Sequence, residues 1–407
     1  MKKVWDKWTR IALVKRILVG LILGAILGIA VPQATGIAIL GDVFVSALKA
    51  IAPLLVFFLV ISSLCNAGKS HGGVIKTVII LYMFSTVLAA VIAVFASMAF
   101  PVKMTLANAA TDTSAPQGIV EVLNNLLLNV VANPVSSLVN ANYVGILMWA
   151  VLLGLAFRVA DKMTKKVLAD VADGISMVVT WIINLAPFGI FGLVFNTVST
   201  NGLDIFTTYG KLLLLLVGCM LFIYFVTNPL LVYWCIRQNP YPLIFHCLKR
   251  SALTAFFTRS SAANIPVNMK VCEEMGLDRD TYSVTIPLGA TINMDGAAIT
   301  ITVMTMATAF TLGIHVDIPT AIILSLLAAL SACGASGVAG GSLLLIPMAC
   351  SLFGISDDIS MQVVAVGFII GVVQDSVETA LNSSSDLLLS ASAEFRQWRK
   401  EGREITY

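Results

Sequence analysis

Long apolar stretches that lack charge constrain this chain more than any other feature. No Lys or Arg occurs between Arg279 and Arg396, and the stretch 318–354 carries no charged residue at all. Of the 407 residues, 58% are hydrophobic and 12% are charged, whereas soluble domains contain roughly 25% charged residues. We therefore expect an integral membrane protein. The small net charge of +3 gives no indication of nucleic-acid binding.

Helical spans are expected wherever about 20 apolar residues follow one another, because that length crosses the hydrocarbon layer. The first apolar run follows a basic segment, as in a signal peptide. We retain it as a span because another apolar run follows at once and no convincing cleavage site is present. The sequence then predicts an all-α protein with eight spans, at 12–32, 37–64, 75–100, 142–159, 172–199, 207–236, 281–314 and 358–393.

The distribution of basic residues predicts the orientation of these spans. The polar stretch 101–143 contains one basic residue, Lys103. Other basic residues cluster at the opposite ends of the spans, which is typical of the cytoplasmic side. We expect a multi-pass protein of the bacterial inner membrane with both termini in the cytoplasm. The clustered residues include Lys69, Lys76, Arg158, Lys162, Lys165, Lys166, Arg237, Lys249, Arg250, Arg396, Arg399, Lys400 and Arg403.

Two segments do not fit simple spans. In 318–354 the apolar arms are too short to cross, and the glycine-rich middle 331–342 disfavours a helix. The segment 241–274 similarly has apolar arms around Thr258 to Ser261. Both are expected to be re-entrant hairpins. Each precedes a helix with polar residues, and this repetition is typical of secondary transporters with inverted repeats.

The apolar helix near residue 290 is interrupted by Asn293-Met294-Asp295-Gly296. An ionised Asp inside the membrane requires a cation, a partner or water. Gly289 and Gly296 permit local unwinding, which frees carbonyl oxygens for a hard cation such as Na⁺. The alternative is a buried Asp that caps a kinked helix.

A narrow polar stripe follows the last span. At about 100° per residue its members project to one side of an otherwise apolar helix. Arg259, at the tip of the first hairpin, is the one basic residue in a segment expected to reach the stripe, and pairing with Asp375 would neutralise one acid. We expect the stripe to face a polar interior site. It consists of Asp375, Glu378, Thr379, Asn382 and Asp386.

Tyr82, Ser85 and Thr86 share one face of the third span. Hydroxyl side chains often bond to the backbone of their own membrane helix. From the residues alone, that ordinary role is favoured over an ion site. Neither the seven scattered cysteines nor the three histidines have the spacing of a zinc site.

The motifs 258–266, 288–296, 334–340 and 375–386 together resemble the dicarboxylate/amino acid:cation symporter family. Within it, the chain is most similar to bacterial carriers that couple serine and threonine to sodium. The resemblance covers all eight spans and both hairpins. It implies an elevator transporter, assembled as a homotrimer, in which a transport unit moves against a fixed scaffold.

The resemblance also implies a division of the chain. Scaffold spans would occupy 1–74 and 142–204, and the transport unit would comprise the third span, 75–100, together with 205–395. An extracytoplasmic loop, 101–141, and a cytoplasmic tail, 396–407, complete the chain.

The substrate site is carried over residue by residue. The resemblance assigns Ser260 and Ser261 to the substrate carboxylate and Asp375 to its ammonium group, with Arg259 as an ion-pair residue. Thr379 and Asn382 would bind the substrate backbone. The lid would consist of Ala335, Ser336, Gly337, Val338 and Gly340.

Sodium, the coupling ion, is implied at three positions, with no other cofactor. The third position reverses the ordinary interpretation of the hydroxyl residues on the third span. The ligand sets are Asn382 and Asp386 with the carbonyl groups of Gly289 and Asn293; carbonyl groups near Thr291 with those of Ala332, Cys333 and Ala335; and Tyr82, Ser85, Thr86, Asn293 and Asp295.

Glu378 departs from the members that carry acidic substrates, which have an Arg at this position. A second substrate carboxylate would meet like charge there, whereas a hydroxyl group can donate to Glu378. We therefore expect serine and threonine as substrates. The alternatives are a proton-coupled carrier that uses Glu378, or a carrier of the same family that selects alanine or a dicarboxylate. An intramembrane enzyme would need an activated nucleophile, which the sequence does not offer.

Overall fold

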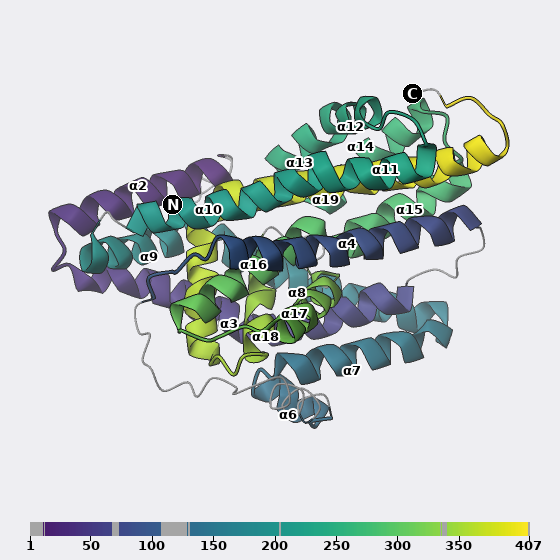
Figure 1. Ribbon diagram of the computed structural model, residues 1–407. Helices are drawn as coiled ribbons and strands as arrows, with labels where there is room; N and C mark the ends of the chain where they lie inside the picture. Colours follow the sequence, from purple (N-terminus) through teal and green to yellow (C-terminus); the bar gives the residue numbers. More distant parts are fainter. Residues whose placement is uncertain are drawn as a thin grey trace.

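The computed structural model describes a helical protein (Figure 1). It contains no β-strand in the residues described, which are 11, 13–66, 73–106, 128, 131–202, 205–333, 335 and 340–405. Six helices in this part of the chain are long and apolar enough to cross a membrane: Thr35–Asn66, Gly73–Ala99, Lys162–Asn184, Phe206–Ile236, Arg279–Thr311 and Asp357–Lys400.

The first half of the chain forms long helices. Helix α8 begins with Asp161 as its N-cap; the backbone N–H of Thr164 donates to that carboxylate and holds the Asp161 pKa below its usual range. The elements are α2 (Leu13–Ala30), η1 (Thr35–Ala38), α3 (Ile39–Asn66), α4 (Gly73–Ala99), α6 (Pro134–Val139), α7 (Tyr143–Ala156), η2 (Phe157–Val159), α8 (Lys162–Asn184) and α9 (Ala186–Asn201).

The second half contains more broken helices. Two π-helical turns, η3 and η4, interrupt longer runs. The elements are α10 (Ile205–Phe222), η3 (Ile223–Thr227), α11 (Asn228–Ile236), α12 (Tyr241–Cys247), η4 (Leu248–Ala252), α13 (Leu253–Thr258), α14 (Ser261–Glu274), α15 (Arg279–Ile292), α16 (Asp295–Thr311), α17 (Ile318–Ala332), η5 (Gly341–Leu345), α18 (Ile346–Ser351) and α19 (Asp357–Lys400).

Most predicted apolar segments correspond to helices within a few residues, but two need correction, and α8 begins at Lys162, well before the predicted start at 172. The segment 172–199, predicted as one span, is two helices that meet at Leu185. Pro187 in the first turn of α9 explains the break, because proline has no N–H for the preceding helix and restricts the residue before it. The last helix, predicted to end at 393, continues to Lys400.

One group of helices packs through glycine contacts. A Cβ on Gly20 of α2 would lie 2.2 Å from the carbonyl oxygen of Pro187, so α2 and α9 touch backbone to backbone. Gly192 of α9 makes an equally close approach to Gly41 of α3, where a Cβ would lie 2.4 Å from the backbone nitrogen. Small residues at such contacts are typical of helices that associate in membranes. In Figure 1, α2 and α9 lie side by side at the left of the view.

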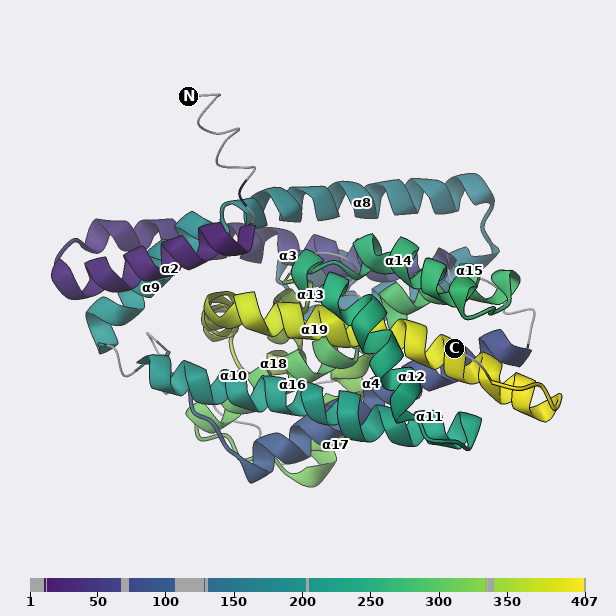
Figure 2. The same ribbon diagram turned by 90° about the horizontal axis from the view of Figure 1, so that it is seen from above.

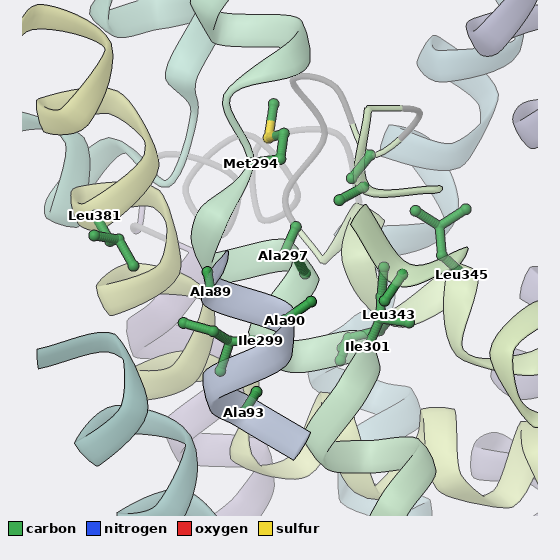
Figure 3. Packing of buried hydrophobic residues seen from close by; sticks show 14 of the residues in the cluster. Ala89, Ala90, Ala93, Met294, Ala297, Ile299, Ile301, Leu343, Leu345 and Leu381 are labelled. Atoms are coloured by element: carbon green, nitrogen blue, oxygen red, sulfur yellow. The ribbon is translucent and has the colours of Figure 1, made fainter. Parts of the chain in front are cut away.

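Helix α19 lies in the middle of the remaining helices (Figure 2). It contacts α10, α11, α13, α14, α15, α16, α18 and α4. Against it, α4 and α16 pack closely through small side chains. Figure 3 shows Ala89, Ala90 and Ala93 of α4 beside Ala297 and Ile299 of α16, all of them fully buried. This close packing leaves little room between the helices that carry the polar residues.

Three breaks in the helices bring backbone atoms into this region. The helix predicted to be interrupted at 293–296 is broken there, since Asn293 and Met294 have non-helical backbone angles between α15 and α16. The chain reverses between α13 and α14 at Arg259 and Ser260. A further turn joins α17 to η5, and of it the structure describes Cys333, Ala335 and Gly340.

Candidate functional site

Asp375 of α19 connects the two reversals of the chain. The Nε atom of Arg259 lies 2.6 Å from Asp375 Oδ2. The backbone N–H of Gly340 donates to Asp375 Oδ1 over 3.1 Å. Both donors sit in the left-handed backbone region, with φ of 53° for Arg259 and 74° for Gly340. The Asp375 carboxylate thus contacts both the reversal between α13 and α14 and the turn between α17 and η5.

The ion pair between Arg259 and Asp375 is buried, with side-chain exposures of 9% and 5%. A buried pair contributes little net stability, but removing one partner leaves an uncompensated charge at a cost of about 3–5 kcal/mol. The left-handed conformation of Arg259 also costs about 1–2 kcal/mol for a residue that is not glycine. Such strain at a chain reversal is typical of functional sites.

Glu378, one turn after Asp375, is buried and accepts three hydrogen bonds. Thr300 of α16 donates over 2.7 Å, Ser342 of η5 over 2.9 Å and Gln374 of α19 over 2.5 Å. None of these donors carries a charge. The carboxylate therefore has polar partners from three elements but no cation among the described residues.

Asp295, at the first position of α16, faces the third predicted span. Ser85 donates to its Oδ2 over 2.7 Å and Thr86 donates to its Oδ1 over 3.1 Å. The hydroxyl oxygen of Thr86 also accepts from the backbone N–H of Met294 over 3.2 Å. Both hydroxyl groups are thus hydrogen-bonded to the Asp295 carboxylate. The Thr86 hydroxyl also lies within hydrogen-bond distance of the Tyr82 carbonyl oxygen in its own helix.

Asp386 is held from the other side of the helix break. Asn293 donates from Nδ2 to Asp386 Oδ1 over 2.9 Å. The hydroxyl group of Tyr82 donates to the Asp386 backbone carbonyl over 2.9 Å. It also lies 2.8 Å from the hydroxyl oxygen of Ser390. The Tyr82 hydroxyl thus lies on the Asp386 side, whereas Ser85 and Thr86 lie on the Asp295 side.

Two glycines permit this close packing. A Cβ on Gly289 would lie 2.8 Å from Asp386 Oδ1 and 2.9 Å from the Tyr82 hydroxyl oxygen. On Gly296 it would lie 2.9 Å from Cγ of Glu378. The backbone N–H of Gly296 also donates to Asn382 Oδ1 over 2.7 Å. A side chain at either position would require these neighbouring atoms to move.

The groups around the helix break fit a hard monovalent cation. Asp295 and Asp386 are at most 1% exposed and form no salt bridge within the described part of the chain. The Oδ1 atom of Asn293 is buried and has no hydrogen-bond partner among the residues described. Buried carboxylates need a compensating charge, and hydroxyl, amide and carboxylate oxygens suit hard cations. No cluster of three His, Cys, Asp or Glu side chains occurs among the described residues, so this oxygen-rich site differs from a zinc site.

The remaining predicted residues lie around these acids. Ser260 caps α14, its hydroxyl oxygen accepting from the backbone N–H of Ala263 over 3.2 Å, and Ser261 is buried beside it. The Cys333 thiol lies 3.7 Å from the carbonyl oxygen of Ile292, which brings α17 to the helix break.

Thr291 and Thr379 lie on the site helices, and neither forms a hydrogen bond with an acidic side chain among the described residues. Thr291 donates to Leu288 of its own helix over 2.7 Å, and Thr379 is buried on α19. Ala332 and Ala335 are also buried. Three predicted lid residues, Ser336, Gly337 and Val338, lie outside the residues that the structure describes.

Sequence reasoning missed two sets of polar residues. One is the set of donors to Glu378; Gln374 lies one turn before Glu378 and was the available signal. The other is a buried network in which Asn264 and Asn268 of α14 contact Ser251 of η4 and Ser383 of α19, at 2.5–3.5 Å. This network links η4 and α14, which precede and follow the chain reversal at Arg259, to α19.

Comparisons with known proteins identify the relatives of this chain. The model of the sodium:dicarboxylate symporter family matches residues 13–394. A serine/threonine transporter SstT of Bifidobacterium adolescentis is 58% identical over 406 residues, covering 100% of this chain and 94% of the relative. Proteins of the same name from two Streptococcus thermophilus strains, LMG 18311 and LMD-9, are 55% and 56% identical, covering 98% of this chain and 100% of each relative. Because the family model spans nearly the whole chain and the relatives match end to end, the chain belongs to the sodium:dicarboxylate symporter family.

Proposed function

We propose that this protein is a sodium-coupled symporter that imports serine and threonine across the bacterial inner membrane, and that it is not an enzyme. The relatives named above are serine/threonine transporters. The single observation that carries the substrate class is Glu378, a buried carboxylate held by neutral donors where the acidic-substrate members of the family resembled here have an Arg. A dicarboxylate would meet like charge at this point.

The amino acid would be bound by its three polar groups. Its ammonium group would pair with Asp375, where the Gly340 N–H and Arg259 now donate. Its carboxylate would lie near Ser260 and Ser261 at the N-terminus of α14, the end of a helix that favours an anion. Its hydroxyl group would donate to Glu378, while Thr379 and Asn382 contact the backbone atoms.

Sodium would bind at the helix break before the amino acid does. Asp295 with Ser85 and Thr86 supplies one oxygen-rich site, and Asp386 with Asn293 supplies another. A third would use backbone carbonyl groups near Thr291, Ala332, Cys333 and Ala335. Coupling arises if sodium stabilises the arrangement of the broken helix and the α17–η5 turn that binds substrate.

The proposed membrane architecture comprises eight spans and two re-entrant hairpins, α12–α14 and α17–α18, with both termini cytoplasmic. A scaffold, 1–74 and 142–204, would hold a transport unit, 75–100 and 205–395, which moves as an elevator within a homotrimer. The contacts of α19 with α4, with α10 to α16 and with α18 support one compact transport unit, and the network at Asn264 and Asn268 supports a first hairpin that moves with α19.

The experiment is uptake of radiolabelled serine into proteoliposomes under an inward sodium gradient, challenged with unlabelled competitors. We expect strong inhibition by threonine, weaker inhibition by alanine, and none by aspartate or glutamate at the same concentration. Strong inhibition by aspartate would overturn the assignment of Glu378.

A proton-coupled carrier is the second candidate, because Glu378 is a buried acid without a cation partner in the described part of the chain. Glu378→Gln distinguishes the two. If the coupling ion is a proton carried by Glu378, the variant loses uphill transport but retains serine exchange. If the coupling ion is sodium, uphill transport remains sodium-driven and the preference for serine over alanine falls.

A further inference from the structure

The carboxyl group of Glu378 is held through one of its two oxygens. Thr300, Ser342 and Gln374 all donate to Oε2, and no described residue donates to Oε1. The donors come from three separate elements, α16, η5 and α19. Three bonds to one atom fix the direction in which the other oxygen points.

We propose that Thr300, Gln374 and Ser342 are positioning residues that hold Glu378 Oε2, so that Oε1 is presented as the acceptor for the hydroxyl group of serine or threonine. This inference rests on the proposed function and extends it, because it says how the hydroxyl group is recognised. The three residues act through Glu378 and do not contact the substrate hydroxyl themselves.

A fixed acceptor is what discrimination between serine and alanine requires. The two substrates differ by one hydroxyl group, and a site built to bond that group rejects the analogue that lacks it only if its own polar atom is then left unpaired. A freely rotating glutamate would turn towards another donor. Three donors already hold Oε2, so the carboxyl group cannot rotate to give Oε1 another donor when alanine is bound.

The packing around Glu378 supports this role. Gly296 lies so close that a Cβ there would be 2.9 Å from Glu378 Cγ and 3.0 Å from its Cα. The backbone of α16 therefore closes one side of the glutamate side chain. The remaining freedom is rotation of the carboxyl group, which the three donors remove.

Gln374 supplies a second indication. Its side chain is fully buried, its Nε2 atom donates to both Thr300 and Glu378, and its Oε1 atom has no hydrogen-bond partner among the described residues. A buried unpaired carbonyl group destabilises a fold. Its presence is explained if the amide nitrogen is required to hold Glu378.

The test compares Thr300→Val with Thr302→Val. Both threonines are fully buried on α16, but the hydroxyl of Thr302 has no hydrogen-bond partner in the part of the chain that the structure describes. The measurement is the ratio of the inhibition constants of unlabelled alanine and unlabelled serine against radiolabelled serine uptake, in proteoliposomes under a sodium gradient. Thr300→Val should lower this ratio by about three- to tenfold, the range of one net hydrogen bond, Thr300→Ser should restore it, and Thr302→Val should leave it unchanged.

A double-mutant cycle identifies the route of the effect. In a Glu378→Gln background, Thr300→Val should change the ratio no further, because the effect of Thr300 passes through the carboxylate. Equal weakening of alanine and serine by Thr300→Val, or an equal effect of Thr302→Val, would overturn the positioning role. If the wild-type protein shows no sodium-dependent serine uptake, the proposed function fails first, before any variant is compared.

Discussion

Gly289→Ala tests the sodium site beside Asp386. Gly289 lies on α15 one turn before the helix break, and because it has no side chain its backbone lies close to the Asp386 carboxylate. An added Cβ would lie 2.8 Å from Asp386 Oδ1, 2.9 Å from Asp386 Cγ and 2.9 Å from the Tyr82 hydroxyl oxygen. Asp386 and Tyr82 are buried, and the Asp386 Oδ1 atom and the Tyr82 hydroxyl group are hydrogen-bonded, so these side chains have little room to move.

The magnitude follows from the size of the clash. An ordinary carbon–oxygen contact is at least 3.4 Å, so Asp386 would have to retreat by about 0.6 Å. Overpacking by one carbon in a tight site costs about 1–3 kcal/mol. If the displaced carboxylate is a sodium ligand, that cost falls on the ion-bound state and the half-saturating sodium concentration rises by about 5- to 150-fold.

The assay is serine uptake into proteoliposomes as external sodium is varied at constant ionic strength. Gly218→Ala is the matched control, because Gly218 lies in helix α10 and an added Cβ would meet nothing within 4 Å. The control should retain the wild-type sodium dependence. An unchanged half-saturating sodium concentration in Gly289→Ala, with the protein folded, would refute a sodium site at Asp386.

Three further predictions test other parts of the site and the fold. Ser85→Ala removes a donor 2.7 Å from Asp295; we expect the half-saturating sodium concentration to rise about three- to tenfold while the maximal rate of serine uptake persists, and loss of uptake at every sodium concentration would count against a purely ionic role. Asp375→Asn should abolish serine binding measured by isothermal titration, because the ammonium group loses its partner and Arg259 is left as an unpaired buried charge; binding of wild-type strength would exclude Asp375 from the site. Asp278→Ala removes the N-cap of α15, which accepts from the backbone N–H and the hydroxyl group of Thr281; we expect a destabilisation of about 1 kcal/mol, seen as a lower midpoint of thermal unfolding with unchanged sodium dependence, and an unchanged midpoint would contradict the capping role.

The sequence predicts the helices well because hydrophobic periodicity and length dominate in a membrane. The helix break at Asn293 and Met294 was predictable, since an Asp and two glycines in an apolar run leave few alternatives. The break at Leu185 was not recognised, although Pro187 was visible. Because the residues on both sides of Pro187 are apolar, the hydrophobic pattern continues across the end of α8 and predicts one span.

Some contacts of the candidate site could be predicted from the sequence, and others could not. Pairing of Arg259 with Asp375 could be predicted because one cation and a stripe of acids were available for it. The donors to Glu378 could not, because Thr300 and Ser342 come from segments whose relative position depends on tertiary packing. Serine and threonine residues are common in membrane helices, and the sequence does not indicate which of them turn towards a carboxylate rather than towards their own backbone.

The most direct test of sodium-coupled serine transport is accumulation of radiolabelled serine in proteoliposomes that contain the wild-type protein, with internal and external pH held equal. An inward sodium gradient should drive serine transiently above its equilibrium level, and replacing external sodium with potassium should abolish this accumulation. Accumulation that is indifferent to sodium and follows an imposed pH gradient would contradict the account.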